Sequence, residues 1–167
     1  MQEESNGRSH FSMAKEAADW ILSRKAGLSN CHLALRFAEY VHIFTQAKER
    51  ISIILFGCEE TKNPLDIKGV LLQNEVLSPL SFDHLRFLSH EVNSSAAGVG
   101  NAIDALVVAT DFLHQQTDGD VAVQSKNILI FTNGIPPFDA RKSEVSALVN
   151  GINAMEATLV AMYVYFC

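Results

Sequence analysis

The stretch that decides the fold is ISIILFGCEETKNPL, residues 51–65. Its first six residues, 51–56, are apolar at every position except Ser52, which is typical of a short β-strand covered on both faces. Gly57 ends the apolar run, and a polar loop follows. A strand covered on both faces needs helices above and below it, so this stretch predicts an α/β domain.

The same pattern returns twice downstream. Residues 127–132, NILIFT, form a second apolar run that ends at Asn133 and Gly134, and residues 157–167, ATLVAMYVYFC, form a third. Strands that alternate with helices predict an open, doubly wound parallel sheet with helices on both faces, and ligands bind such sheets at the carboxyl ends of the strands. Apolar spacing predicts helices over residues 11–22, 81–92, 98–115 and 139–156, and residues 73–77 are expected to form a short edge strand.

One segment, residues 31–44, fits two structures. Leu33, Phe37, Tyr40 and Phe44 recur at helical spacing, while Leu33, Leu35 and Phe37 alternate as in a strand. The helix-forming residues around Leu35 favour the helix, and the strand remains an alternative.

Composition and charge narrow the class of protein. A chain of 167 residues with 48% hydrophobic residues fits one globular domain, and a net charge of -6 makes it a poor nucleic-acid binder by itself. Three scattered cysteines predict neither a disulfide framework nor a zinc site, so a reducing compartment is expected. The polar start carries no secretory signal, and no apolar run is long enough to cross a membrane.

The run ILFGCEETKNPL resembles part of a known family. Its strand ends in Phe-Gly, and the loop that follows has the form T-x-N-x-L, as in the von Willebrand factor A-like domain that opens the large subunit of the Ku heterodimer. Two further matches follow in order, namely the D-A-L triplet at residues 104–106 and ILIFTN at residues 128–133. The resemblance covers residues 47–132 well and the rest loosely.

The amino-terminal part departs from that family. Domains of this kind open with a central apolar strand, and this chain has none before its first helix. Residues 27–45 are expected to be an insertion. The resemblance therefore implies a single, partial von Willebrand A-like domain over residues 1–167, in which the strands at 51 and 127 lack their usual shared neighbour. The DNA-encircling β-barrel of Ku proteins is absent from these residues.

The resemblance also implies a function. It predicts an amino-terminal protein-interaction module in a nuclear protein that acts in double-strand break repair by non-homologous end joining. The expected partners are the small Ku subunit and repair factors that carry short peptide motifs, with DNA ends reached only through the full-length heterodimer. The alternatives are another von Willebrand A-like scaffolding or adhesion domain, and an α/β enzyme.

No catalytic, cofactor-binding or metal-binding residue is predicted. The family is sometimes classed with ATP-dependent helicases, but the sequence has no phosphate-binding loop and no nucleophile elbow. The metal loop of von Willebrand A domains is missing, and Asn133 stands where the metal-binding form has aspartate. The loop at 58–65 has two interpretations of equal weight, since Thr61 and Asn63 either bond their own backbone or contact a partner. The family-motif and candidate partner-contact residues are Phe56, Gly57, Thr61, Asn63, Pro64, Leu65, Asp104 and Asn133.

Overall fold

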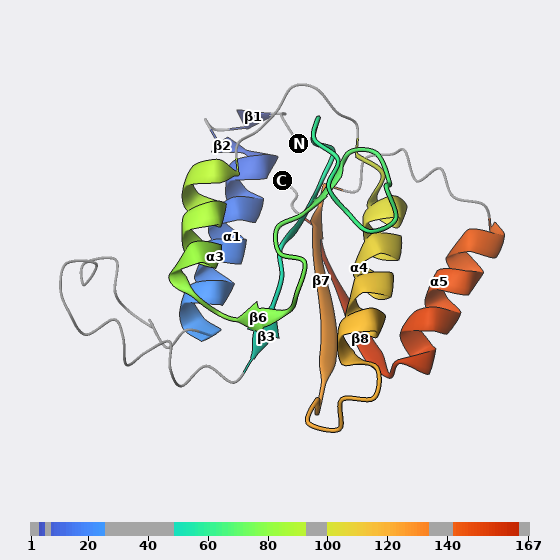
Figure 1. Cartoon of the computed structure of the whole chain (residues 1–167). Coiled ribbons are helices and arrows are strands. Elements are labelled where there is room, and N and C mark those ends of the chain that lie inside the picture. The colour runs from blue at the N-terminus through green and yellow to red at the C-terminus, as the bar shows by residue number, and fades with distance from the viewer. Residues whose placement is uncertain (1–3, 6–7, 26–48, 93–99, 134–141, 164–167) are drawn as a thin grey trace. The chain divides into compact units, whose positions relative to one another are not determined.

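The computed structural model describes residues 4–5, 8–25, 49–92, 100–133 and 142–163. The chain divides into two compact units, each built from two stretches of sequence: Met1–Ile53 with Asn74–Ser94, and Ile54–Gln73 with Ser95–Cys167. Helices and strands occur in both units, so the chain is an α/β protein, as the alternating pattern predicts (Figure 1).

The described residues of the first unit form two short antiparallel sheets and a pair of packed helices. Its elements are β1 (Glu4–Ser5) paired with β2 (Arg8–Ser9), α1 (His10–Lys25), β3 (Arg50–Ile51) paired with β6 (Ser78–Pro79), α3 (Phe82–Arg86) and the π-helical turn η1 (Phe87–Glu91). Helix α1 packs against α3 and η1. The ammonium group of Lys15, on α1, donates to the carbonyls of Ser89 and Val92, both at 2.9 Å, and so satisfies backbone acceptors near the end of η1.

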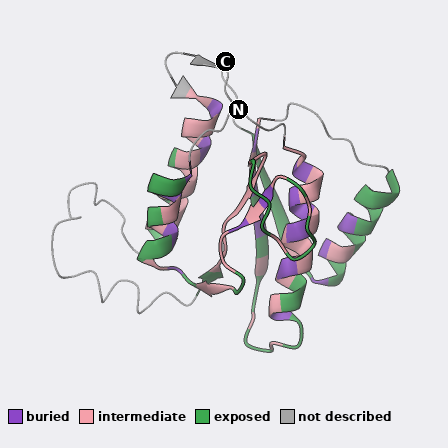
Figure 2. Ribbon diagram, turned by 45° about the horizontal axis from the view of Figure 1, so that its top comes forward, coloured by how far each residue is buried: buried purple, intermediate pink, exposed green. Residues whose placement is uncertain are grey.

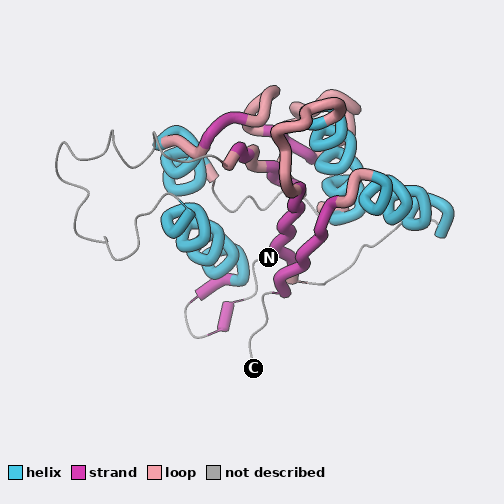
Figure 3. The backbone as a smooth tube through the Cα atoms, turned by 90° about the horizontal axis from the view of Figure 1, so that it is seen from below, coloured by secondary structure: helices cyan, strands magenta, loops and turns pink. Residues whose placement is uncertain are grey.

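The second unit contains the longest strands of the structure. Its elements are β4 (Ile54–Phe56) paired antiparallel with β5 (Val70–Leu72), α4 (Ala102–Thr117), β7 (Lys126–Thr132) paired parallel with β8 (Ala157–Tyr163), and α5 (Lys142–Ala154). Strands β7 and β8 lie side by side over their full lengths, from Lys126 opposite Ala157 to Thr132 opposite Tyr163 (Figure 3).

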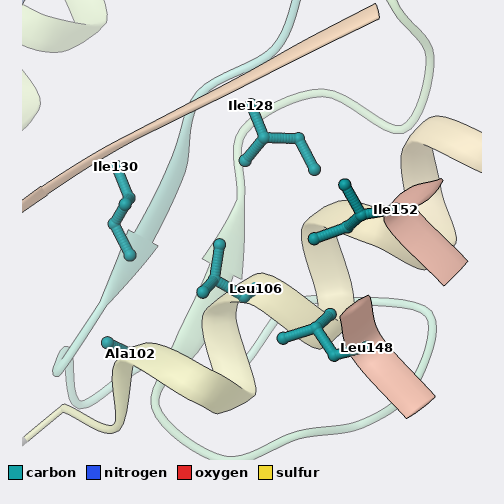
Figure 4. Packing of buried hydrophobic residues seen from close by; sticks show 6 residues of the cluster. All are labelled: Ala102, Leu106, Ile128, Ile130, Leu148 and Ile152. Atoms are coloured by element: carbon teal, nitrogen blue, oxygen red, sulfur yellow. The ribbon is translucent and has the colours of Figure 1, made fainter. Parts of the chain in front are cut away.

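The core of the second unit lies between β7 and two helices. Ile128 and Ile130 project from one face of β7, because alternate residues of a strand share a face. They pack with residues of α4 and α5, so both helices cover that same face (Figure 4). The cluster consists of Ala102, Leu106, Ile128, Ile130, Leu148 and Ile152.

The helices expected from apolar periodicity are present where the structure describes them, except that the segment at 81–92 divides into α3 and the π-helical turn η1 and leaves Val92 outside the helix. Leu88 and Val92 are buried as predicted for the segment at 81–92. Helix α4 begins at Ala102, four residues later than predicted, because the side chain of Asn101 accepts a hydrogen bond from the backbone N–H of Ile103 at 3.0 Å and caps the helix.

The prediction of one strand over residues 51–56 is wrong. The run instead contributes to two short strands, with Ile51 in β3 and residues 54–56 in β4, and Ser52 and Ile53 lie between them outside any strand. All six residues are half-buried and not fully covered on both faces. The run divides because its two ends pair with different partners, β6 and β5.

The prediction of an edge strand at residues 73–77 is also wrong. The strand lies earlier, at β5, and ends at Leu72. Gly69, with a φ of 71°, turns the chain so that Val70 and Leu72 face the interior at 2% exposure. Residues 73–77 then connect β5 to β6 without joining a sheet.

The open, doubly wound sheet is not observed. The described strands form four two-stranded sheets, of which only β7 with β8 is parallel. Strand β7 is buried on one face alone, and every residue of β8 after Ala157 is exposed (Figure 2). The strand patterns predicted burial on both sides, whereas α4 and α5 cover one face of β7 and leave the other exposed.

Several predictions fall on residues outside the described ranges. These are the segment at 31–44, the insertion at 27–45, and the predicted ends of elements at 98–99, 139–141 and 164–167. Among the described helices, none is both long and apolar enough to span a membrane.

Candidate functional site

The loop of residues 57–69, called here the 57–69 loop, joins β4 to β5 and carries most of the predicted contact residues. It opens and closes on glycines with left-handed backbone angles, Gly57 at a φ of 75° and Gly69 at 71°. The N–H of Gly57 donates to the carbonyl of Gly69 at 2.9 Å. A Cβ atom at Gly69 would lie 3.3 Å from the carbonyl oxygen of Cys58. The two glycines therefore bring the ends of the loop together.

Asn63 braces the interior of the 57–69 loop. Its amide nitrogen donates to the carbonyls of Ile67 and Val70, each at 2.8 Å, and its amide oxygen accepts from the N–H of Ile67 at 2.9 Å. Such side-chain bonds to nearby backbone are the usual role of asparagine in tight turns. Asp66, which lies between Asn63 and Ile67 in this turn, has a left-handed conformation, at a φ of 53°.

Thr61 and Lys62 fasten one arm of the loop to β5. The hydroxyl of Thr61 accepts from the N–H of Gly69 at 3.0 Å. The N–H of Lys62 donates to the carbonyl of Val70 at 3.1 Å, and the carbonyl of Lys62 accepts from Leu72 at 2.7 Å. Together with the bonds of Asn63, these bonds fix the backbone conformation of the loop.

The thiol of Cys58 is also engaged. It donates to the carbonyls of Glu60 at 3.2 Å and Gly69 at 3.3 Å. Burial raises the pKa of the Cys58 thiol, which lowers its thiolate fraction at neutral pH. Cys58 is thus a poor nucleophile.

The tip of the loop is left facing solvent. Pro64 is exposed and Leu65 is 41% exposed, whereas the polar groups of Thr61 and Asn63 point back into the loop. Thr61 and Asn63 therefore fit the first interpretation of this loop, in which their side chains bond nearby backbone. Of the loop residues predicted to contact a partner, Pro64 and Leu65 present the apolar surface that could do so.

The base of the loop touches the core of the second unit. Phe56 is half-buried and packs against the core cluster. Gly100, just before α4, approaches so closely that a Cβ atom there would lie 2.5 Å from the nitrogen of Gly57. Gly69 and Gly100 were not singled out by sequence reasoning. The glycine directly before the apolar residues of β5 could have indicated the first, while the second depends on tertiary contact.

The remaining two predicted residues lie outside the loop. Asp104 occupies the first turn of α4, where its negative charge complements the positive end of the helix dipole. Asn133 directly follows β7 and is half-buried. Within the described ranges, no three His, Cys, Asp or Glu side chains come together as a metal site would require.

A comparison with protein families places these features in context. The family described as the Ku70/Ku80 N-terminal alpha/beta domain matches residues 1–156. The match includes β4, the 57–69 loop, α4 and β7, which carry the sequence motifs described above. Because it covers nearly the whole chain, the protein belongs to the family of Ku N-terminal alpha/beta domains.

Proposed function

We propose that this chain is the amino-terminal protein-interaction module of a Ku large subunit and acts in double-strand break repair by non-homologous end joining. The observation that carries the proposal is the family match over residues 1–156. Assignment to the large subunit is supported by the Phe-Gly and T-x-N-x-L pattern of residues 56–65 and by the D-A-L triplet at 104–106.

The proposed role is that of a scaffold and not of an enzyme. Its partner in the heterodimer is the small Ku subunit, in the nucleus, and DNA ends are reached through the complete heterodimer. The net charge of -6 supports this division of roles, since an acidic domain repels the phosphate backbone.

The tip of the 57–69 loop is the proposed contact for short peptides of repair factors. Thr61 and Asn63 hold the loop in place through hydrogen bonds, so little further ordering is needed when a ligand binds. Leu65, at 41% exposure, offers an apolar side chain that a peptide could cover. Because Leu65 is 41% exposed, covering the rest of its side chain contributes about two fifths of the value for a whole leucine, about 0.6–1.2 kcal/mol, or roughly threefold to eightfold in affinity.

Two binding experiments test the proposal. The purified chain should co-purify with the small Ku subunit and not with a second large subunit, and the opposite preference would overturn the subunit assignment. Fluorescently labelled peptides from end-joining factors should bind the chain, as measured by fluorescence anisotropy. The Leu65→Ser variant should weaken binding by about threefold to eightfold.

Val121→Ser is the matched control, because Val121 is fully exposed and lies in the connection between α4 and β7, away from the 57–69 loop in sequence. It should bind peptides as the unaltered chain does. Equal effects of the two substitutions would refute the loop as the contact site. Failure of every peptide to bind would refute the role in peptide recognition while leaving the subunit test intact.

A further inference from the structure

The first unit contains a buried histidine whose two ring nitrogens both have partners. His84, on α3, is 1% exposed. Its Nδ1 lies 3.2 Å from the backbone nitrogen of Ser81 and 3.0 Å from the Ser81 hydroxyl. Its Nε2 lies 3.0 Å from the side-chain amide of Asn74 and 3.3 Å from the hydroxyl of Ser78. One ring thus connects the start of α3, the strand β6 and the segment before it.

These contacts determine where the proton of the ring resides. A backbone N–H can only donate, so the Nδ1 that faces Ser81 accepts and carries no proton. A neutral imidazole has one proton, which is therefore on Nε2. Nε2–H needs an acceptor, and the Ser78 hydroxyl, at 3.3 Å, can accept its proton. The amide nitrogen of Asn74 lies 3.0 Å from Nε2, and Asn74 accepts from the ring once its amide is turned so that the oxygen takes the place of that nitrogen.

The bond between Ser81 and His84 is half of a capping box. Ser81 is the N-cap of α3, its side chain accepts from the backbone N–H of His84, and the His84 ring accepts from the backbone N–H of Ser81. Glutamate or glutamine usually fills this third position of the helix. Here the acceptor is an imidazole, which can take up a proton.

Protonation would oppose this arrangement in three ways. A proton on Nδ1 removes the acceptor for the Ser81 N–H, places positive charge at the N-terminus of a helix, and creates a charge in a buried position. Burial lowers the pKa of His84 below 6.5, while Asp83 and the backbones of Ile51 and Ser81 act in the opposite direction without reversing the shift.

Within the described part of the chain, the side chains hydrogen-bonded to the ring are the uncharged Asn74, Ser78 and Ser81. The segment before β6 and β6 itself face it with the side chains of Asn74 and Ser78, and β3 contributes the backbone of Ile51. Helix α1 also packs against α3. The charged Lys15 of α1 is bound to the carbonyls of Ser89 and Val92, at the end of η1. Asp83 is the charged side chain that acts on the ring.

We propose that His84 is a proton-operated latch in the first unit. As the neutral Nε2–H tautomer it joins the start of α3 to β6 and to Asn74, and on protonation it releases them. The latch is closed above the ordinary pKa of about 6.5. As pH falls below that value, the open segment takes up a proton that the closed one excludes, so opening becomes favourable by up to tenfold per pH unit.

Two measurements on the full chain test the latch. Nitrogen-15 NMR of the His84 ring at pH 7.5 should show a proton on Nε2 and none on Nδ1. Hydrogen-exchange protection factors for the amides of Leu85 and Arg86 should fall by up to tenfold per pH unit between pH 6.5 and 5, while those of Val108 and Phe112 in α4 serve as internal controls and change less.

The matched variant is His84→Gln. Glutamine can accept from Ser81 and donate to the Asn74 and Ser78 groups but does not titrate, so the pH dependence of protection at Leu85 should disappear in this variant. A proton on Nδ1 at pH 7.5, or protection at Leu85 that is independent of pH in the unaltered chain, would overturn the proposal. Equal pH dependence in His84→Gln would do the same, and the two measurements on the unaltered chain decide the matter if that variant does not fold.

Discussion

Gly100→Ala should destabilise the second unit strongly, because there is no room for a methyl group at this position. A Cβ atom on residue 100 would lie 2.5 Å from the nitrogen of Gly57, 2.7 Å from its Cα and 2.8 Å from the Cδ2 of Phe56. Ordinary contacts between such atoms are about 3.5–4.0 Å. The backbone at the end of β4 would have to move by about 1 Å.

The expected cost has two parts. Forcing an extra methyl group into a packed site costs about 1–3 kcal/mol. Moving Gly57 also strains its hydrogen bond to the carbonyl of Gly69, at 2.9 Å, and a bond of this kind contributes about 1 kcal/mol net. The sum, about 2–4 kcal/mol, is a large part of the 5–15 kcal/mol by which domains are usually stable.

Urea unfolding of the full chain, followed by far-ultraviolet circular dichroism, measures this cost. With a slope of about 2 kcal/mol per molar urea, the midpoint should fall by about 1–2 M in Gly100→Ala. Gly151→Ala is the matched control. It lies within α5, and its Cβ atom would meet only the Cγ2 of Thr110, at 3.6 Å, so the gain in helix propensity should raise stability by about 0.5–1 kcal/mol.

The reasoning would be refuted by two results. A midpoint for Gly100→Ala close to that of the unaltered chain would show that the contact with Gly57 does not constrain the structure. A similar loss in Gly151→Ala would show that the second unit tolerates no added methyl group anywhere, and that the close approach at Gly100 is not the cause.

Two further predictions concern the loop and the exposed strand. Asn63→Ala removes three hydrogen bonds and should lower the free energy of unfolding in urea by about 1–3 kcal/mol. The control is Asn153→Ala, at an exposed position, which should leave the stability nearly unchanged. Equal urea midpoints for the two variants would contradict the role of Asn63. Because the residues of β8 after Ala157 are exposed and include Leu159 and Met162, the purified chain should bind a hydrophobic dye under native conditions. Absence of dye binding before unfolding begins would contradict this interpretation.

The helices were predictable because their patterns are local. The spacing of Leu106 and Leu113, seven residues apart, places apolar groups on one side of a helix whatever the helix packs against. The ends of helices were predicted less well. Asn101 caps α4 through a single side-chain bond, which apolar spacing does not indicate.

The strands were predicted less completely, because a strand depends on its neighbours. Residues 51–56 divide into β3 and β4 since their two ends pair with β6 and β5. Residues 157–163 form β8 as predicted, yet they are exposed, because a run of apolar residues indicates a tendency to be buried and not the presence of a covering element.

The candidate site shows the same division. Its motif, residues 56–65, was visible in the sequence and identified the family resemblance that the match over residues 1–156 confirms at family level. Which of its residues face solvent was not visible. Thr61 and Asn63 bond back to β5 and its turn, while Leu65 remains exposed.

The sequence alone determined the α/β class, the positions of the helices and the Ku-like motifs, since each depends on residues that are neighbours along the chain. Only the tertiary structure decided the sheet pairing, the closure of the 57–69 loop on Gly69, the close approach of Gly100 to Gly57 and the burial of His84. Each of these depends on hydrogen bonds or steric contact between residues that no local pattern connects.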